Sequence, residues 1–269
     1  MSSVAAGRES SRSATNVLGI AGVGALVYVL ADLLHELGHL AATLLPLGVE
    51  PISISTIGVS SYGSSAIVAL TGPVVNLVLA LALFFANARS LPPAWRYFAW
   101  LFGSVNLFNA IAYLPFSALL GSGDWAVVFN AIADPSLWRP LVGLVGLVLY
   151  VASVRVSVRS LRELCSSGVV ASANIESYCM LTYWTGGLVL TAGAVFNPIS
   201  PWYILTSGAA AGFGAMLGLV FVPKFVQRAA APESSSVEFL QLAWPWMAAG
   251  AAAIVVFIGI FGPGIRIGA

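Results

Sequence analysis

Charged residues are scarce in this chain. They make up 8% of its 269 residues, as 11 Lys and Arg and 10 Asp and Glu, whereas 59% of the residues are hydrophobic. This balance excludes an ordinary soluble globular domain, in which about a quarter of the residues are charged. The formal net charge is +1, and no run of basic residues occurs. The sequence therefore predicts no nucleic-acid partner.

Cysteine is also nearly absent. Cys165 and Cys179 are the only two, and their spacing matches no metal-binding motif. A single pair makes no disulfide framework, and we expect both to be free thiols.

Apolar runs of about 20 residues recur along the chain, and each is long enough to cross the hydrocarbon layer as a helix. The sequence predicts an all-α polytopic membrane protein with about seven transmembrane helices and the lipid bilayer as a partner. The predicted spans are residues 17–44, 67–87, 94–114, 138–154, 178–197, 202–222 and 240–261. The Ser- and Ala-rich residues 1–16 are predicted to form a disordered polar tail. The first apolar run is too long for a cleavable signal and should be retained.

Residues 50–66 differ from the spans around them. Ile and Val alternate there with Ser and Thr, and Gly58 and Gly63 interrupt the pattern. This alternation predicts a short β-hairpin or strand element after the first helix, with a plain surface loop as the alternative. An edge strand at this place could pair with an extended substrate.

The only two histidines of the chain lie in His35-Glu36-Leu37-Gly38-His39, inside the first apolar run. In a helix, positions 35 and 39 are one turn apart on the same face. Two imidazoles at this spacing can bind one Zn²⁺, with Glu36 placed as a general base. Ionisable side chains in a membrane span are costly and mark functional sites. The sequence therefore predicts a zinc centre with His35 and His39 as ligands.

A hydrolytic zinc centre needs a third protein ligand and an open position for water. With both histidines used, the third ligand is expected to be a carboxylate. Asp124 is favoured because Gly121-Ser122-Gly123 before it can fold back toward the bundle. Asp134 is the alternative third ligand. If it does not bind the metal, it is expected to belong to a solvated loop. Asp32, one turn before His35, is better placed to hydrogen-bond a ligand than to bind the metal.

The distribution of Lys and Arg predicts an orientation. With seven spans, nine of these 11 residues fall on the side of the N-terminus, and only Arg139 and Arg266 fall on the other side. This bias predicts a cytoplasmic N-terminus in a multi-pass protein, which we expect in the plasma membrane. The same count places the histidine motif and Asp124 toward one face of the membrane.

Three segments together resemble the site-2 protease family of intramembrane zinc metalloproteases. They are His35-Glu36-Leu37-Gly38-His39, Gly72-Pro73-Val74-Val75-Asn76 in the next span, and a later segment with Asn109, Pro115 and Asp124. The resemblance covers residues 17–130, which would form the zinc metalloprotease membrane core, and leaves 131–269 as accessory transmembrane helices.

The resemblance implies that His35, His39 and Asp124 bind zinc and that Glu36 activates water for hydrolysis of a transmembrane protein substrate. It also implies that Asn76 and an asparagine before Asp124, either Asn109 or Asn106, line the site. The amide of Asn76 is a candidate donor to the developing oxyanion. A hydrogen bond between helices is the alternative role for this residue.

Two other functions are compatible with a metal centre in such a chain. A membrane zinc hydrolase of lipid amides would typically use more histidines than the two available here. A metal transporter or a metal-stabilised scaffold without catalysis should require further carboxylates or thiols along a path, and the second half of the chain has few. A purely structural metal site has no need of Glu36. This residue therefore separates the two enzyme hypotheses from a transporter or scaffold without catalysis.

Overall fold

The computed structural model describes residues 2–86, 90–197, 199–226 and 243–267. Their α-helices are α1 (Ser2–Ala42), α2 (Ala66–Phe85), α3 (Pro93–Leu120), α4 (Asp124–Asn130), α5 (Pro135–Ser166), α6 (Ile175–Val195), α7 (Leu217–Phe225) and α8 (Ala243–Val256). A 3₁₀ turn, η2 (Ser172–Asn174), and two π-helices, η3 (Ile204–Gly214) and η4 (Phe257–Phe261), complete the helical structure. The strands are β1 (Glu50–Ser55), β2 (Gly58–Tyr62) and β3 (Ile265–Arg266).

Six helical segments in the described part of the chain are long and apolar enough to cross a membrane. They are Val17–Ala42, Ala66–Phe85, Pro93–Leu120, Pro135–Ser166, Ile204–Phe225 and Trp244–Phe261. The fifth predicted span, 178–197, falls on α6, which is not among them. Glu176 and several threonines reduce the apolar character of α6, and the helix packs against both α1 and η3.

The first helix is longer than the sequence predicts. Its backbone is helical from Ser2, so it includes most of the segment predicted as a disordered tail. Residues 2–16 contain a single glycine, Gly7, and no proline. Nothing in the local sequence therefore forces the helix to begin later. Arg89 and Arg228, which contribute to the charge asymmetry, lie outside the described residues.

The third helix also exceeds its prediction, because it continues through Pro115 to Leu120. Gly146 of α5 lies directly against Pro115, and a Cβ there would come within 2.6 Å of the proline Cδ. The helix ends at Gly121, whose φ of 68° is the left-handed conformation of a common helix C-cap. Gly123 also has a positive φ, of 87°, and the chain then turns into α4.

The predicted hairpin is confirmed. Strands β1 and β2 pair antiparallel, from Glu50 opposite Tyr62 to Ser55 opposite Gly58. A third strand, β3, pairs with the other side of β1, where Ser53 lies opposite Arg266. The order is therefore β2-β1-β3, and the outer edge of β2 is unpaired within this sheet.

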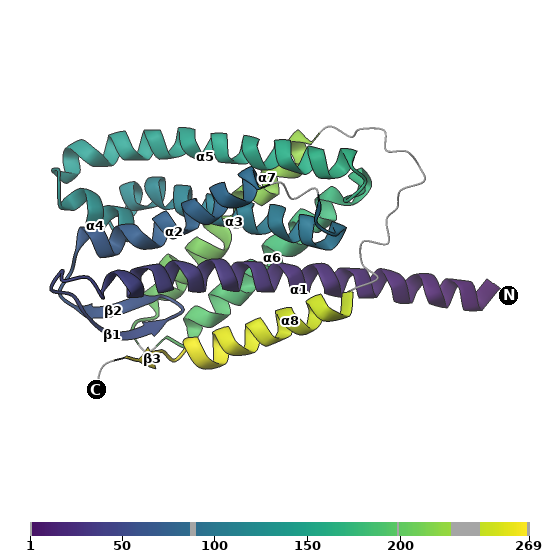
Figure 1. Cartoon of the computed structure of the whole chain (residues 1–269), viewed down its shortest axis with the longest axis horizontal. Helices are drawn as coiled ribbons and strands as arrows, with labels where there is room; N and C mark the ends of the chain where they lie inside the picture. The colour runs from purple at the N-terminus through teal and green to yellow at the C-terminus, as the bar shows by residue number, and fades with distance from the viewer. Residues whose placement is uncertain (1, 87–89, 198, 227–242, 268–269) are drawn as a thin grey trace.

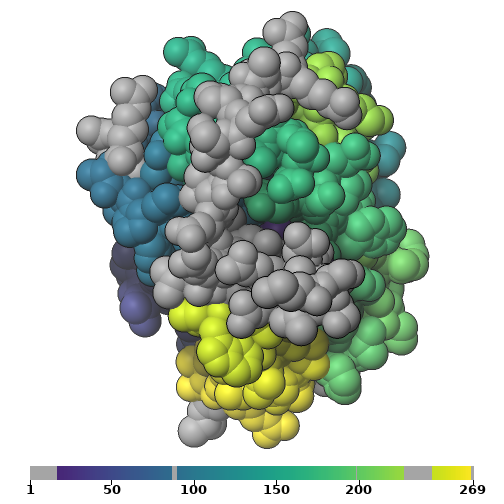
Figure 2. Space-filling model, turned by 90° about the vertical axis from the view of Figure 1, so that its right-hand side faces the viewer, coloured from purple at the N-terminus to yellow at the C-terminus, as the bar shows by residue number. Residues whose placement is uncertain are grey.

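The helices run roughly along the long axis of the molecule, and the sheet and α4 lie together at one end (Figure 1). The core surrounds α1, α3 and α6, where Tyr28, Tyr97 and Phe108 are fully buried. Figure 2 views the opposite end, where α3 begins and where α5 connects to α6. Because α4 begins at Asp124, the candidate metal ligands lie at the end of the molecule that carries the sheet.

Candidate metal centre

Helix α1 brings the two histidines together. His35 and His39 are one turn apart, and their Nε2 atoms are 3.1 Å from each other. Both side chains are buried, with relative exposures of 5% and 6%. The helical spacing predicted from the sequence is therefore present, and both rings point to one place.

Asp124 reaches this place from a distant part of the chain. It is the first residue of α4 and follows the left-handed Gly123. Its Oδ2 atom is 3.0 Å from Nε2 of His35, and its Oδ1 atom is 3.5 Å from Nε2 of His39. His35, His39 and Asp124 could hold a metal ion, because one ligand atom from each lies within 4.8 Å of the others.

Asp134, the alternative ligand, has a local role instead. It caps the N-terminus of α5 by accepting hydrogen bonds from the backbone N–H of Ser136, at 2.8 Å, and from its hydroxyl. Those two hydrogen bonds, first the hydroxyl and then the backbone N–H, lower the pKa of the exposed Asp134 carboxyl. An exposed N-cap carboxylate of this kind is a common way to start a helix.

The spacing of the three ligands fits a small tetrahedral ion. Zinc bonds of about 2.0–2.1 Å place the ligand atoms of a regular tetrahedron about 3.3 Å apart. The observed separations are 3.0, 3.1 and 3.5 Å. A His₂-carboxylate set can hold zinc, with a fourth position for water, and it also holds other divalent transition metals such as iron.

Hydrogen bonds behind the rings fix their orientation. Nδ1 of His39 donates to the carbonyl oxygen of Val68 at 2.7 Å, and Nδ1 of His35 donates to Oδ1 of Asn76 at 2.5 Å. A neutral imidazole that carries its proton on Nδ1 has a lone pair on Nε2. Two such lone pairs and a carboxylate oxygen then face one another, an arrangement that a cation stabilises.

Asn76 lies behind His35 and outside the residues that line the adjoining cavity. Its side chain is fully buried, and its Nδ2 donates both to the carbonyl of Ala31, at 3.2 Å, and to Oδ1 of Asn106, at 2.7 Å. Both amide hydrogens are therefore used, and the amide does not point to a reacting group. Of the two asparagines suggested to precede Asp124 at the site, Asn106 joins this network. Asn109 is buried, and its Oδ1 has no hydrogen-bond partner in the part of the chain that the structure describes.

Gly72 is a site residue that sequence reasoning missed. It lies on α2 directly over the two rings, where a Cβ would come within 2.4 Å of His39 Nε2 and 2.6 Å of His35 Nε2. Gly38 on α1 is also closely packed, because a Cβ added there would be 3.1 Å from the Thr71 carbonyl oxygen. The available signal was the Thr71-Gly72-Pro73 sequence, since a glycine inside a span often marks a close approach of two helices.

Glu36 is buried beside the three candidate ligands, and its Oε2 atom has no hydrogen-bond partner among the described residues. The backbone of Val59 in β2 interacts with the same carboxylate. An unpaired carboxyl oxygen in a buried position is expensive unless it has a function or a water partner. Asp32, one turn earlier on α1, interacts electrostatically with Glu36 and His35 but is not one of the three ligands.

The metal-site candidates open into a cavity of about 480 Å³. Its walls come from β2, from the loop before α2, from α3, and from the start of η3 with the residues before it. Tyr113 of α3 stacks on His35, with the ring centroids 5.9 Å apart, and shares the cavity wall with Glu36 and Asp124. The edge strand β2 contributes Val59 and Ser61 to the wall. A bound molecule could therefore contact the strand and the candidate catalytic groups together.

Comparison with known proteins finds no matching family model, no matching curated protein and no matching solved structure. The functional assignment therefore rests on the chemistry of the site itself.

Proposed function

We propose that this chain is an intramembrane zinc metalloprotease, similar to the site-2 protease family, that cleaves membrane-spanning protein substrates. One observation carries the proposal: a buried His35-His39-Asp124 cluster shares a cavity with Glu36, whose carboxylate lacks a full set of partners. A structural metal site or a transport site would gain nothing from an acid with one free carboxylate oxygen beside its ligands, whereas hydrolysis requires a base there.

The cavity favours a peptide over a lipid amide as substrate. Strand β2 lies at the edge of its sheet, and residues 57–59 and 61 line the cavity. An extended peptide could add to this edge through a row of backbone hydrogen bonds. A lipid amide has no peptide backbone and could not pair with the strand in this way. A transmembrane helix must unwind locally before its peptide bond can be attacked, and pairing with β2 would stabilise the unwound segment.

Each of the chain's own groups has a role in this reaction. A bound Zn²⁺ would lower the pKa of a water molecule and polarise the scissile carbonyl. Glu36 accepts the proton of the attacking water and later delivers it to the leaving amine. The hydroxyl of Tyr113, which lines the same cavity, donates a hydrogen bond to the oxyanion that forms as water adds to the carbonyl carbon. Asn76 acts as a positioning residue, because it holds Nδ1 of His35 so that Nε2 faces the ion.

The decisive experiment uses the full-length protein reconstituted in liposomes with a panel of single-span test proteins. The metal content of each preparation is measured by mass spectrometry, and cleavage is followed on gels. We expect the wild-type protein to contain one zinc and to cleave at least one substrate. Glu36→Gln should retain the zinc and lose about 10²- to 10⁴-fold in rate.

Glu163→Gln is the matched control, because Glu163 is an exposed glutamate on α5 that lies outside the metal-site cavity. This variant should cleave at the wild-type rate. Turnover by Glu36→Gln at the wild-type rate would exclude Glu36 as the general base. A zinc-loaded wild-type protein that hydrolyses lipid amides and no protein substrate would instead support the lipid hydrolase.

A further inference from the structure

A second cavity, of about 620 Å³, lies away from the metal centre. It is enclosed by the last residues of α2, the first turns of α3 and the last turns of α5. Each of these three helices contains a candidate membrane span. Because the cavity lies where the spans end, it belongs at the level where hydrocarbon gives way to lipid headgroups.

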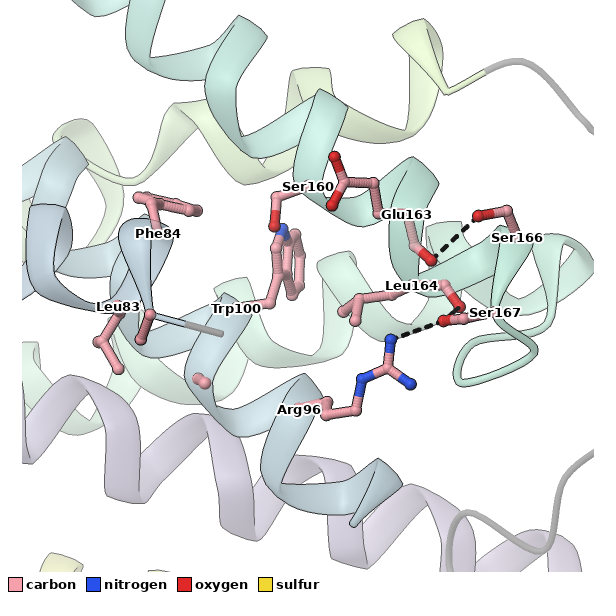
Figure 3. A pocket seen from close by; sticks show the side chains of 11 residues that line it. Leu83, Phe84, Arg96, Trp100, Ser160, Glu163, Leu164, Ser166 and Ser167 are labelled. Atoms are coloured by element: carbon pink, nitrogen blue, oxygen red, sulfur yellow. Dashed lines mark hydrogen bonds between the residues drawn. The ribbon is translucent and has the colours of Figure 1, made fainter. Parts of the chain in front are cut away.

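The walls of this cavity are apolar on one side and polar on the other. Figure 3 shows Leu83 and Phe84 at one end, Arg96 with Ser167 at the other, and the ring of Trp100 between them. This division matches an amphiphilic ligand, whose chains and charged group need different surroundings.

Arg96 is the candidate anion ligand. One Nη of its guanidinium donates to the hydroxyl of Ser167 at 2.7 Å, and Arg96 forms no ion pair within the residues that the structure describes. A guanidinium carries five N–H donors in a planar fork that fits phosphate oxygens, so most of these donors remain available. Glu163, the one acid in the cavity wall, is 3.9 Å from Arg159 in an exposed ion pair.

The charge around the cavity favours an anion. The described residues at this end of the bundle include four basic side chains and two acidic ones, namely Arg96, Arg159, Arg162 and Lys224 against Glu163 and Glu176. A net positive surface beside the bilayer attracts anionic headgroups.

We propose that this cavity binds an anionic glycerophospholipid, with the phosphate on Arg96 and Ser167 and an acyl chain against Leu83 and Phe84. This site is independent of the metal centre and of the proposed proteolysis. Its occupant would fill the gap between α2, α3 and α5 and tie the three helix ends together at the membrane surface.

The test is a titration of the purified full-length protein in detergent with dioleoyl phosphatidylglycerol, followed by native mass spectrometry. Three further ligands separate the parts of the lipid: glycerol 3-phosphate, inorganic phosphate, and dioleoylglycerol without a phosphate. We expect one tightly bound phosphatidylglycerol and at least tenfold weaker binding of the other three. Arg96→Gln should weaken phosphatidylglycerol binding at least tenfold, because it removes the charge-assisted hydrogen bonds.

Arg155→Gln is the matched control, since it removes the same charge from an exposed position of α5 outside the cavity. It should change the affinity less than twofold. Ser167→Ala, a small change that leaves the fold intact, should weaken binding about threefold by releasing Arg96. Equal losses from Arg96→Gln and Arg155→Gln, or no loss from both Arg96→Gln and Ser167→Ala, would overturn the site. Glycerol 3-phosphate binding as tightly as the lipid would overturn the lipid as its occupant.

Discussion

Replacement of Gly72 by alanine tests the metal centre without removing any ligand. Gly72 packs over both imidazole rings, and the added Cβ would lie 2.4 Å from His39 Nε2 and 2.6 Å from His35 Nε2. Ordinary contact begins near 3.4 Å, so at least one ring has to move by about 1 Å. Metal–ligand distances tolerate changes of only about 0.2 Å. We therefore expect the site to lose one or both histidine ligands.

The expected loss of zinc affinity is estimated from the effect of substituting residues that hydrogen-bond a metal ligand without binding the metal. Removal of a group that merely orients a ligand typically lowers metal affinity 10- to 100-fold. Displacement of the ligand itself should exceed this, so Gly72→Ala should weaken zinc binding at least 100-fold. The helix should tolerate the change, because alanine favours a helix over glycine by about 1 kcal/mol.

The assay is competition with a chromophoric chelator, supported by the absorption spectrum of the cobalt-substituted protein. Gly103→Ala is the matched control, because Gly103 is also a buried glycine within a span, and a Cβ there would approach its neighbours only to 3.4 Å. Thermal unfolding of the metal-free proteins should show both variants folded. Wild-type zinc affinity in Gly72→Ala would mean that the ion is not held by the two Nε2 atoms beneath this glycine.

Four further substitutions test individual side chains. Asp124→Ala should lose bound zinc whereas Asp134→Ala should retain it, and metal analysis of the two purified variants decides between these carboxylates. Asn76→Ala should lower zinc affinity about 10- to 100-fold because His35 loses the acceptor at Nδ1; an unchanged affinity in chelator competition would reject this positioning role. Tyr113→Phe should lower kcat roughly 10²-fold while KM and zinc content stay unchanged, and a loss confined to KM would assign Tyr113 to substrate binding instead.

The parts of the site that follow from local periodicity were predictable. His35, Glu36 and His39 occupy one turn of one helix, so their mutual arrangement depends on helical geometry alone. Asp124 lies 89 residues from His35, and no local rule links the two. It could be predicted because the chain has so few acids that elimination left two serious candidates, and the glycines before it permit a reversal of the chain.

Features that depend on how distant segments meet were not predictable. The environment of Gly72 requires knowledge of where α2 crosses α1. The sequence left two roles open for Asn76, a donor to the oxyanion or a hydrogen bond between helices. The structure shows the second, because both of its amide hydrogens are taken by Ala31 and Asn106, and a single sequence could not decide between the two. Strand β3 is two residues long and pairs with a segment more than 200 residues earlier, so its apolar pattern carries no recognisable signal.

The second half of the chain also takes part in the site, although the sequence suggested only accessory helices there. The backbone N–H of Thr56 donates to the Phe261 carbonyl, and that of Ile267 donates to the Ile52 carbonyl. The hairpin is thereby fixed from the side opposite its free edge. Trp202 and Thr206 line the cavity that contains the metal-site candidates. The candidate ligands come from α1 and α4, whereas the cavity wall comes partly from the second half. If the proposed proteolysis is correct, changes near η3 should alter which substrate is cleaved before they alter metal binding.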